Sequence, residues 1–463
     1  MAQLARAPRR LAVLTLALVL GSAAVTAPGG SATAGTASAA VASTATPPGT
    51  FGLAQQWGVQ GYMQDGGTLE HSDVQAFTES NGMVFAGGNF ARVQKGATAT
   101  GADRVEQPYL AAFDADTAAY VPGFRPTFND EVHTLATLPD GTVLAGGKFT
   151  VVNGVTARGI VALNPLTGAV VPGWTVQLQQ RSTDLNKLPL ELVVRDIEVS
   201  GAKVFIAGAF SHASTGGYPG TVVYVHNVVQ VSTTNPRINT AFRPRPNDVV
   251  WEVSVSPDTT MMYLAGRFTA VIGAAGQPAT AIKVTGVRTS DGLQVPGMAA
   301  PTFSNGRKYQ QAVEAVGSRV YYGGAEHMLF GVDASTFQRR SASITERGGD
   351  LQVIEEVNGG VILGGCHCYQ YNYQDATSYP VTTYSRRDPI RFVGAWDAAT
   401  GDYLPQFVPV GVRTRNSHGA WAILQASNGD VWVGGDFTGI QMQPGQGTKW
   451  TGGFFRLPGA PYA

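Results

Sequence analysis

We expect an all-β fold for this chain, a seven-bladed β-propeller of four-stranded antiparallel blades, from its repeats, its strand pattern and its composition. A short apolar run followed by two small residues, usually glycines, occurs seven times, and five copies carry a phenylalanine two residues later. Repeats spaced about 41 to 70 residues apart with strand-like composition are typical of propellers and other arrays. The chain also has 58 glycines and only 14% charged residues, as turn-rich β proteins do. The last glycines of the seven copies are Gly88, Gly147, Gly208, Gly266, Gly324, Gly365 and Gly435.

The second repeat shows the strands of one blade most clearly. Alternating residues at 132–138 are followed by a Pro-Asp-Gly turn at 139–141 and by an apolar run at 142–149. Two further strands are expected at 159–163 and 169–174. The first and sixth repeats follow the same order, so four antiparallel strands make one unit.

The two ends of the chain are expected to complete the ring together. The seventh repeat is short, because the chain ends soon after Leu457 without a fourth strand. Residues 53–63 have no place in the first blade, which begins near Val74. We expect this segment to supply the missing strand and to close the ring without a free edge.

One stretch of the chain matches a known type of repeat. Residues 132–149 read V-x-x-L-A-x-x-P-D-G-x-V-L-A-G-G-x-F, and weaker copies cover residues 71–457. The pattern resembles the repeats of secreted bacterial delta-sixty-type β-propeller proteins. The resemblance implies the propeller fold, but it implies no chemistry, because this fold-level family has no one agreed activity.

The first 27 residues are expected to be an export signal. An arginine-containing segment precedes an apolar run at 11–20 that is too short for a permanent membrane anchor. Ala-x-Ala sequences allow cleavage as late as residue 39. Residues 28–50 are then a flexible linker rich in small and polar residues, and 51–463 form a single propeller. We therefore expect a secreted, extracellular protein.

The charge balance argues against one class of partner, and the hydrophobicity of the chain argues against another. Without the three arginines of the signal the chain has 29 (32 − 3) basic and 32 acidic residues and no basic stripe. Nucleic acid is therefore a poor candidate partner. No later stretch is long and apolar enough for a membrane segment, so no membrane association is expected. We expect a monomer without a cofactor.

The loops differ in length between the two ends of the expected blades. Tight turns such as 139–141 join the first and second strands. The connections between the second and third strands, at 91–108 and 368–389, are long and expected to be irregular, and the link between blades at 175–191 is also long. These long segments emerge at the same end of the ring. Variable loops on a rigid scaffold form binding sites, so this end is the expected ligand-binding face.

A pair of repeated segments is interpreted as structural. Phe124-Arg125-Pro126 with Asn129-Asp130 recurs at 242–244 with 247–248. Asn and Asp side chains readily bond to nearby backbone, so we interpret the motif as a blade-joining device with a capped turn.

Two repeats depart from the pattern, and there we place the candidate catalytic residues. In the alignment, repeats five and six carry Glu326 and His367 where the other repeats carry phenylalanine. Ionisable groups in place of a buried ring cost folding free energy unless they are paired or exposed. A polar pocket of Glu326, His327, Asp350 and His367 would hold an acid or base with a histidine partner. The alternative is that Glu326 and His327 only form a tight turn.

Aromatic and basic side chains near these repeats are candidates for ligand binding. Aromatic platforms on a nearly neutral secreted protein suit sugar rings or extended polymers, although ordinary interblade packing remains an alternative for each ring. An anionic group would be held by Arg307, Arg347, Arg413 or Arg415. The expected ligand-binding residues are Tyr369, Tyr371, Tyr373, Arg413, Arg415, His418 and Trp421.

The only two cysteines, Cys366 and Cys368, are two residues apart. In a strand their side chains point to the same side, near the long limit for a disulfide, and export favours oxidation. A disulfide is ranked first, buried free thiols second and a soft-metal site third, because a strand directs His367 to the opposite side. We therefore expect no metal.

The sequence leaves three functions open. The first is a secreted propeller that binds an extracellular carbohydrate or cell-wall polymer on its long-loop face. The second is a glycan hydrolase or lyase with its acid and base in blades five and six. The third is a structural or protein-binding scaffold without catalysis.

Overall fold

The computed structural model describes residues 45–61, 73–181, 191–216, 221–299, 309–346 and 349–460. The expected export signal, its cleavage sites and most of the expected linker lie outside these ranges, as do Arg307 and Arg347. Within them the single helix is a 3₁₀ turn, Gly101–Asp103, and no helix is long and apolar enough to cross a membrane.

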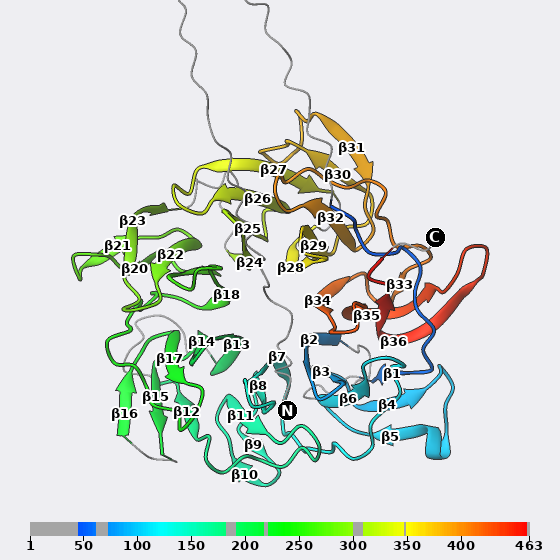
Figure 1. Ribbon diagram of the computed structural model, residues 1–463, viewed down its shortest axis with the longest axis horizontal. Helices are drawn as coiled ribbons and strands as arrows, with labels where there is room; N and C mark the ends of the chain where they lie inside the picture. The colour runs from blue at the N-terminus through cyan, green and yellow to red at the C-terminus, as the bar shows by residue number, and fades with distance from the viewer. Residues whose placement is uncertain are drawn as a thin grey trace, which may run out of the picture.

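Small antiparallel sheets stand around a common centre, which is the arrangement of a β-propeller (Figure 1). The all-β expectation is confirmed. The inner strand of each repeat contacts the inner strand of the next, and the last one, β34, lies beside the first, β2. In chain order the inner strands are β2 (Asp73–Ser80), β7 (Val132–Thr137), β13 (Val193–Ser200), β18 (Val250–Val255), β24 (Gln310–Val316), β28 (Leu351–Val357) and β34 (Ala420–Gln425).

The glycine phrases all lie in the second strands, which pair antiparallel with the inner strands. These are β3 (Met83–Asn89), β8 (Val143–Gly147), β14 (Lys203–Ala209), β19 (Met261–Gly266), β25 (Arg319–Gly324), β29 (Val361–Cys366) and β35 (Val431–Gln441). The third strands are β6 (Leu110–Asp114), β11 (Ile160–Leu163), β17 (Val228–Ser232), β22 (Val284–Arg288), β26 (Met328–Asp333), β32 (Val393–Asp397) and β36 (Thr448–Leu457).

The outermost strand is shorter than expected in several repeats. Repeats four and five have full strands there, β23 (Gln294–Ala299) and β27 (Arg339–Thr345). In the second repeat the strand expected at 169–174 is a single bridge between Leu163 and Val170. Pro172 follows two residues later, and proline has no N–H to continue the ladder.

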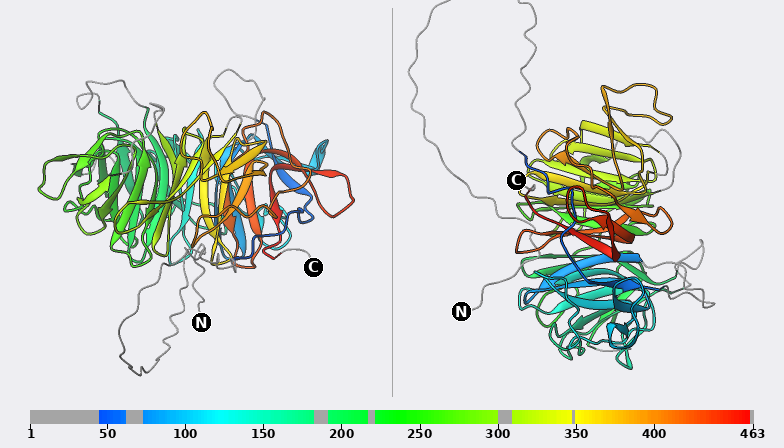
Figure 2. Two further views of the ribbon diagram at one scale, coloured as in Figure 1. Left: turned by 90° about the horizontal axis from the view of Figure 1, so that it is seen from above. Right: turned by 90° about the vertical axis from the view of Figure 1, so that its right-hand side faces the viewer.

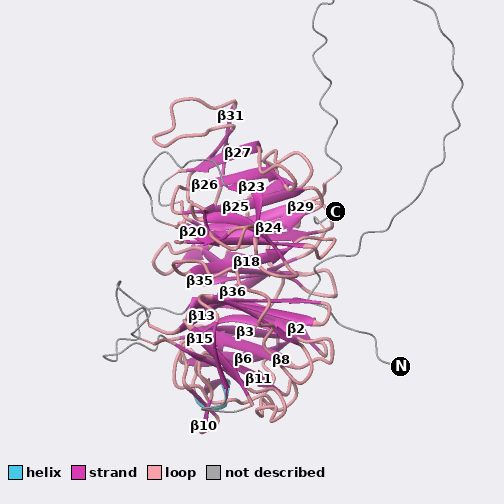
Figure 3. Ribbon diagram, turned by 90° about the vertical axis from the view of Figure 1, so that its left-hand side faces the viewer, coloured by secondary structure: helices cyan, strands magenta, loops and turns pink. Residues whose placement is uncertain are grey.

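The apolar core lies between neighbouring sheets, which stand side by side in a flat disc (Figure 2). Phe85 of the first repeat and Leu135 of the second belong to one buried cluster, and the rings of Phe85 and Phe124 meet edge to face with centroids 4.8 Å apart. Strands occupy most of the described chain, and loops lie along both faces of the disc (Figure 3).

In five of the repeats the connection between the second and third strands contains a hairpin, so the expectation of irregular loops was wrong there. Asn153 and Gly154, both with positive φ, form the two-residue turn of one hairpin, which is the strongest short-range hairpin signal. The hairpins are β4 (Arg92–Lys95) with β5 (Arg104–Glu106), β9 (Val151–Val152) with β10 (Val155–Thr156), β15 (His212–Thr215) with β16 (Thr221–Tyr224), β20 (Ala270–Ile272) with β21 (Pro278–Thr280), and β30 (Tyr371–Gln374) with β31 (Arg386–Pro389).

The repeated Asn-Asp segment caps these hairpins, as interpreted from the sequence. The side-chain oxygen of Asn129 accepts hydrogen bonds from the amides of Thr150 and Val151, both at 2.9 Å. The oxygen of Asn247 accepts from the equivalent amides in repeat four at 2.8 and 3.0 Å. The capping interpretation is therefore confirmed.

The N-terminal segment runs along the last strand before it turns away. The amides of Gly49 and Leu53 donate to the carbonyls of Pro458 and Arg456, both at 2.8 Å. Strand β1 (Trp57–Gln60) then pairs with β4 instead of with the seventh repeat. Residues before β1 therefore follow the outer edge of β36, while β1 itself extends a hairpin of the first repeat. Two further link strands, β12 (Val176–Gln179) and β33 (Arg413–Thr414), pair with β15 and β35.

Candidate functional site: the central channel

The inner strands share a β-bulge near their first residues. In each one the register with the second strand shifts around one extra residue. The side chains at these positions line one cavity of about 140 Å³ at the centre of the propeller. We call the set the channel ring: Gln75, His133, Arg195, Trp251, Gln311, Gln352 and Trp421.

The bulge explains the repeated glycine. A Cβ atom on Gly147 would lie 2.0 Å from the carbonyl oxygen of Glu131, and one on Gly435 would lie 1.9 Å from that of Gly419. Both carbonyls belong to the second residue before the bulge. In these repeats the last glycine of the phrase is therefore required, because the backbone beside the bulge leaves no room for a side chain.

One side of the channel ring carries a stack of a cation and two aromatic rings. The guanidinium carbon of Arg195 lies 4.5 Å from the ring centroid of Trp251. Trp251 stacks on Tyr309 with centroids 5.6 Å apart and planes at 19°. The hydroxyl of Tyr309 donates to Asp350 Oδ2 at 3.0 Å. Arg195, Trp251, Tyr309 and Asp350 thus form a continuous series across four repeats.

The other side of the ring is organised by Gln352. With its amide oriented to satisfy its neighbours, its oxygen accepts from His367 Nε2 at 2.8 Å and from Trp421 Nε1 at 3.2 Å. Its nitrogen donates to the carbonyls of His418 and Ala420 at 2.9 and 3.0 Å. The ring of His367 lies 6.0 Å from that of His418 and 6.2 Å from that of Trp421. Two clusters of rings, Trp251 with Tyr309 and Trp421 with His367 and His418, therefore flank one channel.

His133 of the channel ring and His367 beside it favour the neutral form. His133 Nδ1 makes a short hydrogen bond to Gln75, and its Nε2 is 3.3 Å from Glu131 Oε2. Burial, together with the positive charges of Arg195 and Lys148, holds the pKa of His133 well below its usual value. Burial also lowers the pKa of His367, although the negative charge of Asp350 opposes this.

Acidic side chains that line the channel join neighbouring inner strands. Asp196 Oδ2 accepts the amide hydrogen of Val253 at 2.9 Å, and Glu252 Oε2 accepts that of Val313 at 2.6 Å. Each carboxylate thus bonds to the backbone of the next repeat. Their position fits a structural role between blades.

Glu326, the first expected catalytic residue, is held in a buried ion pair. Its side chain is 1% exposed, and Lys283 Nζ lies 2.9 Å from Oε1. Gln310 donates a short hydrogen bond to the other oxygen. The amide of His327 donates to Gly324 O at 3.0 Å, so Glu326 and His327 do form a tight turn. Burial raises the pKa of Glu326, and the hydrogen bond and charge of Lys283 oppose this.

The other three expected catalytic residues lie near one another beside the channel. His327 Nε2 is 3.5 Å from Asp350 Oδ1, and the amide of His367 donates to the carbonyl of Asp350 at 3.3 Å. His367 also bonds to Gln352 of the channel ring. The structure therefore brings together His327, Asp350 and His367, while Glu326 is directed to Lys283.

The alignment of repeat six was wrong by one residue. Leu351, before the bulge, pairs with Cys366, and the amide of Phe392 donates to the carbonyl of Cys368 at 2.7 Å. In repeat one the equivalent acceptor is the carbonyl of Phe90. Cys368, not His367, therefore takes the phenylalanine position, because Cys366 fills the place of the last glycine. The two cysteines form a disulfide with Cα atoms 5.1 Å apart, and both are buried.

The expected tyrosines lie away from the channel ring. Tyr371 and Tyr373 are on β30, which pairs with β27 of repeat five. Arg387 lies over the ring of Tyr371 at 4.4 Å, and the Tyr373 hydroxyl makes a short hydrogen bond to Glu346. Tyr369 is 55% exposed.

The basic candidates are separated from those tyrosines. Arg413 is exposed on β33, and the amide of Arg415 donates to the carbonyl of Asp436 at 2.9 Å. The amides of His418 and Gly419 donate to the carboxylate of Asp436 at 3.2 and 3.0 Å. Of the expected ligand-binding residues, only Trp421 belongs to the channel ring, with His418 beside it.

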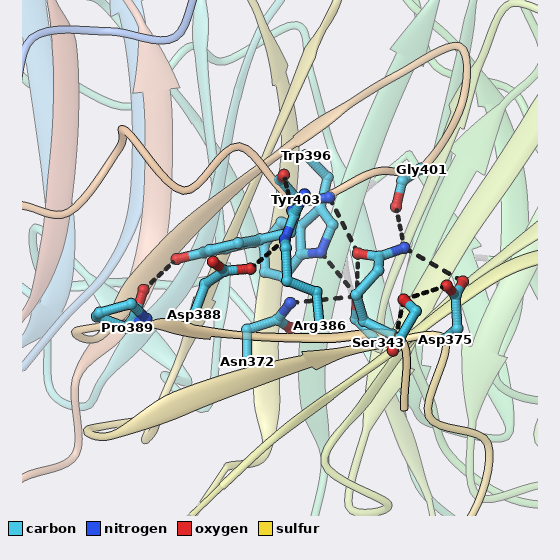
Figure 4. Close-up of polar contacts among 11 residues, drawn as sticks. Ser343, Asn372, Asp375, Arg386, Asp388, Pro389, Trp396, Gly401 and Tyr403 are labelled. Carbon is cyan, nitrogen blue, oxygen red and sulfur yellow. Dashed lines mark hydrogen bonds and ion pairs between the residues drawn. The ribbon is translucent and has the colours of Figure 1, made fainter. Parts of the chain in front are cut away.

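A polar network fixes the tyrosine-rich hairpin between repeats five and six (Figure 4). The Ser343 hydroxyl accepts from Trp396 Nε1 at 3.0 Å, and Arg386 donates to the carbonyl of Tyr403 at 2.6 Å. The Tyr403 hydroxyl donates to the carbonyl of Pro389 at 2.7 Å. The hairpin thus belongs to the sheet of repeat five and joins it to repeat six.

Six of the seven ring residues were missed from the sequence, although a positional signal existed. Each lies 13 to 15 residues before the last aligned glycine of its repeat, as Gln75 does before Gly88. Their residue types differ, so no motif reveals them. Only the bulge seen in the structure shows that these seven sequence positions point to one place.

Comparisons with known proteins add little beyond the fold. No family model matches the chain, and no curated protein matches it. The crystal structure of the WD40 β-propeller domain of Doa1 is similar, with 10% identity, a TM-score of 0.44, and coverage of 87% of this chain and 96% of that one. A crystal structure of the computationally designed Ika8 protein has 10% identity, a TM-score of 0.44, and coverage of 88% and 100%.

Proposed function

We propose that the chain is a secreted seven-bladed propeller of the delta-sixty type that binds an extracellular carbohydrate or cell-wall polymer at its central channel. Seven inner strands in a closed order of neighbours support the blade number. The hydrogen bonds of Gly49 and Leu53 to the end of β36 support closure by the N-terminal segment. The ligand site is shifted from the expected tyrosines to the channel ring.

A single observation carries the functional proposal: two aromatic clusters flank one polar channel. Trp251 packs against Arg195 and Tyr309 on one side, and Trp421 lies beside His367 on the other. The polar side chains of Gln75 and Gln311 also line the cavity. Flat apolar faces beside such groups match the alternating C–H faces and hydroxyl edges of sugars.

The size of the cavity restricts how such a ligand binds. Sites that enclose a small molecule usually measure about 300–1,000 Å³. The cavity inside the channel ring measures about 140 Å³. A sugar therefore binds at the end of the channel formed by the bulges, with only one residue or substituent entering. A polymer lying across that end fits this requirement.

Catalysis at Glu326 has little support, because this carboxylate is engaged by Lys283 and Gln310. Asp350 is likewise engaged, by His327 and Tyr309. Binding without reaction is therefore the proposed function, and released product is included in its test as the contrary result.

Trp421→Ala is expected to weaken binding to the best ligand of a polysaccharide panel by about tenfold or more, the loss expected when a stacked ring is removed. Affinity is measured by isothermal titration calorimetry, and released sugars are measured in parallel. Tyr369→Ala, an exposed tyrosine outside the ring, is the matched control and is expected to bind normally. Loss of binding in Tyr369→Ala but not in Trp421→Ala would place the site at the hairpin instead, and released product would indicate an enzyme.

A further inference from the structure

The channel ring contains a half-buried arginine whose Nε atom has no hydrogen-bonding partner among the residues described. Arg195 projects from the bulge of β13, with its guanidinium over the face of Trp251. Its Nε is buried and has no partner among the residues described, and no ion pair is found for it there. A guanidinium has five N–H donors, and a buried one is normally paired with carboxylates or other acceptors.

Two neighbours of Arg195 also present unpaired polar atoms. Trp251 Nε1 and Gln311 Oε1 are buried and lack hydrogen-bond partners within the described ranges. Both residues line the same cavity as Arg195. Buried polar groups are nearly always satisfied in native proteins, so the unpaired groups of these three cavity-lining residues would gain partners from a polar ligand.

The charges around Arg195 leave its guanidinium as an available cation. Glu131 and Glu191 are the carboxylates that act on it, and burial lowers the pKa of Arg195 in spite of them. Glu131 is already bonded to Asn89 at 2.6 Å and lies 3.8 Å from Lys148 Nζ. His133 is neutral, as described above.

The remaining acidic residues of the cavity do not neutralise Arg195. Asp196 and Glu252 are bound to backbone amides of the next repeats, and Glu355 belongs to β28, on the far side of the cavity in strand order. None of the three is among the charges that act on Arg195.

We propose that the carbohydrate bound at the channel is acidic and that Arg195 binds its carboxylate, with Trp251 Nε1 as a second donor. This inference rests on the proposed function and names its ligand class: a uronic-acid-containing glycan. A carboxylate accepts two parallel N–H donors from a guanidinium, whereas a neutral hydroxyl leaves the cation unpaired. Inorganic phosphate shares this chemistry, so it is a separate arm of the test.

The test compares size-matched oligogalacturonate and neutral oligogalactoside, together with inorganic phosphate, by calorimetry on the full chain. The wild type is expected to bind the acidic oligomer at least about tenfold more tightly, and Arg195→Gln to remove this preference while neutral binding persists. Arg413→Gln, which removes an exposed arginine outside the ring, is the matched control and should retain the preference. Because Arg195→Gln could destabilise the fold, the salt dependence of wild-type binding is measured too, and only acidic-oligomer affinity should fall with salt.

The outcomes separate this inference from the proposed function. One outcome is that acidic and neutral oligomers bind equally, and that this binding is lost in Trp421→Ala but unchanged in Arg195→Gln. It would overturn the proposal that the ligand is acidic and leave the proposal of carbohydrate binding intact. If phosphate binds in a way that depends on Arg195, and uronate is not preferred over the neutral oligomer, the ligand of Arg195 is a free anion and not a sugar carboxylate. Absence of binding to every glycan would overturn the proposed function and this inference with it.

Discussion

Gly147→Ala is expected to lower the free energy of unfolding by about 3 kcal/mol or more, because no rearrangement of side chains relieves the clash. The new Cβ would lie 2.0 Å from the backbone oxygen of Glu131 and 3.1 Å from the Cα of Val132. The bulge would have to move, and His133 would move with it out of the channel ring. Urea denaturation monitored by tryptophan fluorescence measures the loss.

Gly173→Ala provides a control in the same repeat. A Cβ on Gly173 meets no atom within 4 Å, and its backbone is not left-handed. The substitution is expected to be neutral or slightly stabilising, because alanine restricts the unfolded chain more than glycine does. Equal stability of Gly147→Ala and Gly173→Ala would contradict the link between the repeated glycine and the bulge.

Lys283→Met is expected to destabilise the protein by about 3–5 kcal/mol at neutral pH, because it leaves the carboxylate of Glu326 buried without its cation. Glu326 is 1% exposed and its nearest charge is the ammonium of Lys283 at 2.9 Å. Adding Glu326→Gln to this variant is expected to restore most of the lost stability. Arg104→Met, which breaks the exposed pair with Glu106, should change stability little.

The pH dependence of Lys283→Met follows from the raised pKa of Glu326. Its ordinary value is 4.5, and burial makes the folded protein bind the proton more tightly than the unfolded chain does. Such a group favours folding most below the ordinary pKa and loses this contribution as pH rises through the folded pKa. Removing Lys283 raises the folded pKa further, so the deficit should be largest at neutral pH and shrink towards pH 4. Thermal denaturation across this range measures it, and a pH-independent deficit would argue against the ion-pair explanation.

Features that depend on residues close together in the sequence were predicted correctly from local patterns. The turn at 139–141, the inner and second strands and the capping role of Asn129 and Asn247 follow from alternation and from short polar side chains. The length of the outermost strand of repeat two was overestimated, because Pro172 lacks the N–H donor that a longer hydrogen-bonded ladder needs.

The site was only partly predictable, because its residues are distant in sequence and unlike in type. Trp421 and His418 were identified through their chemistry, and Glu326 through its departure from the repeat. Its partner Lys283 lies in another repeat, so the ion pair was not visible. The sequence alignment assigned His367 instead of Cys368 to the phenylalanine position. It matched the glycine pairs of the repeats, whereas the hydrogen-bonded register of the sheet matches Cys366 with the last glycine.

The repeated glycine phrase was sufficient to establish an all-β array and to mark the repeats with unusual residues. It could not show that the last glycine faces a bulge in every repeat except the sixth, because a bulge is a relation between two strands that are separated by a turn. Once the inner strands stand side by side, one residue from each bulge meets the others at the centre. Seven unrelated side chains thereby become one ring, because the radial packing of the sheets brings equivalent positions of distant repeats together.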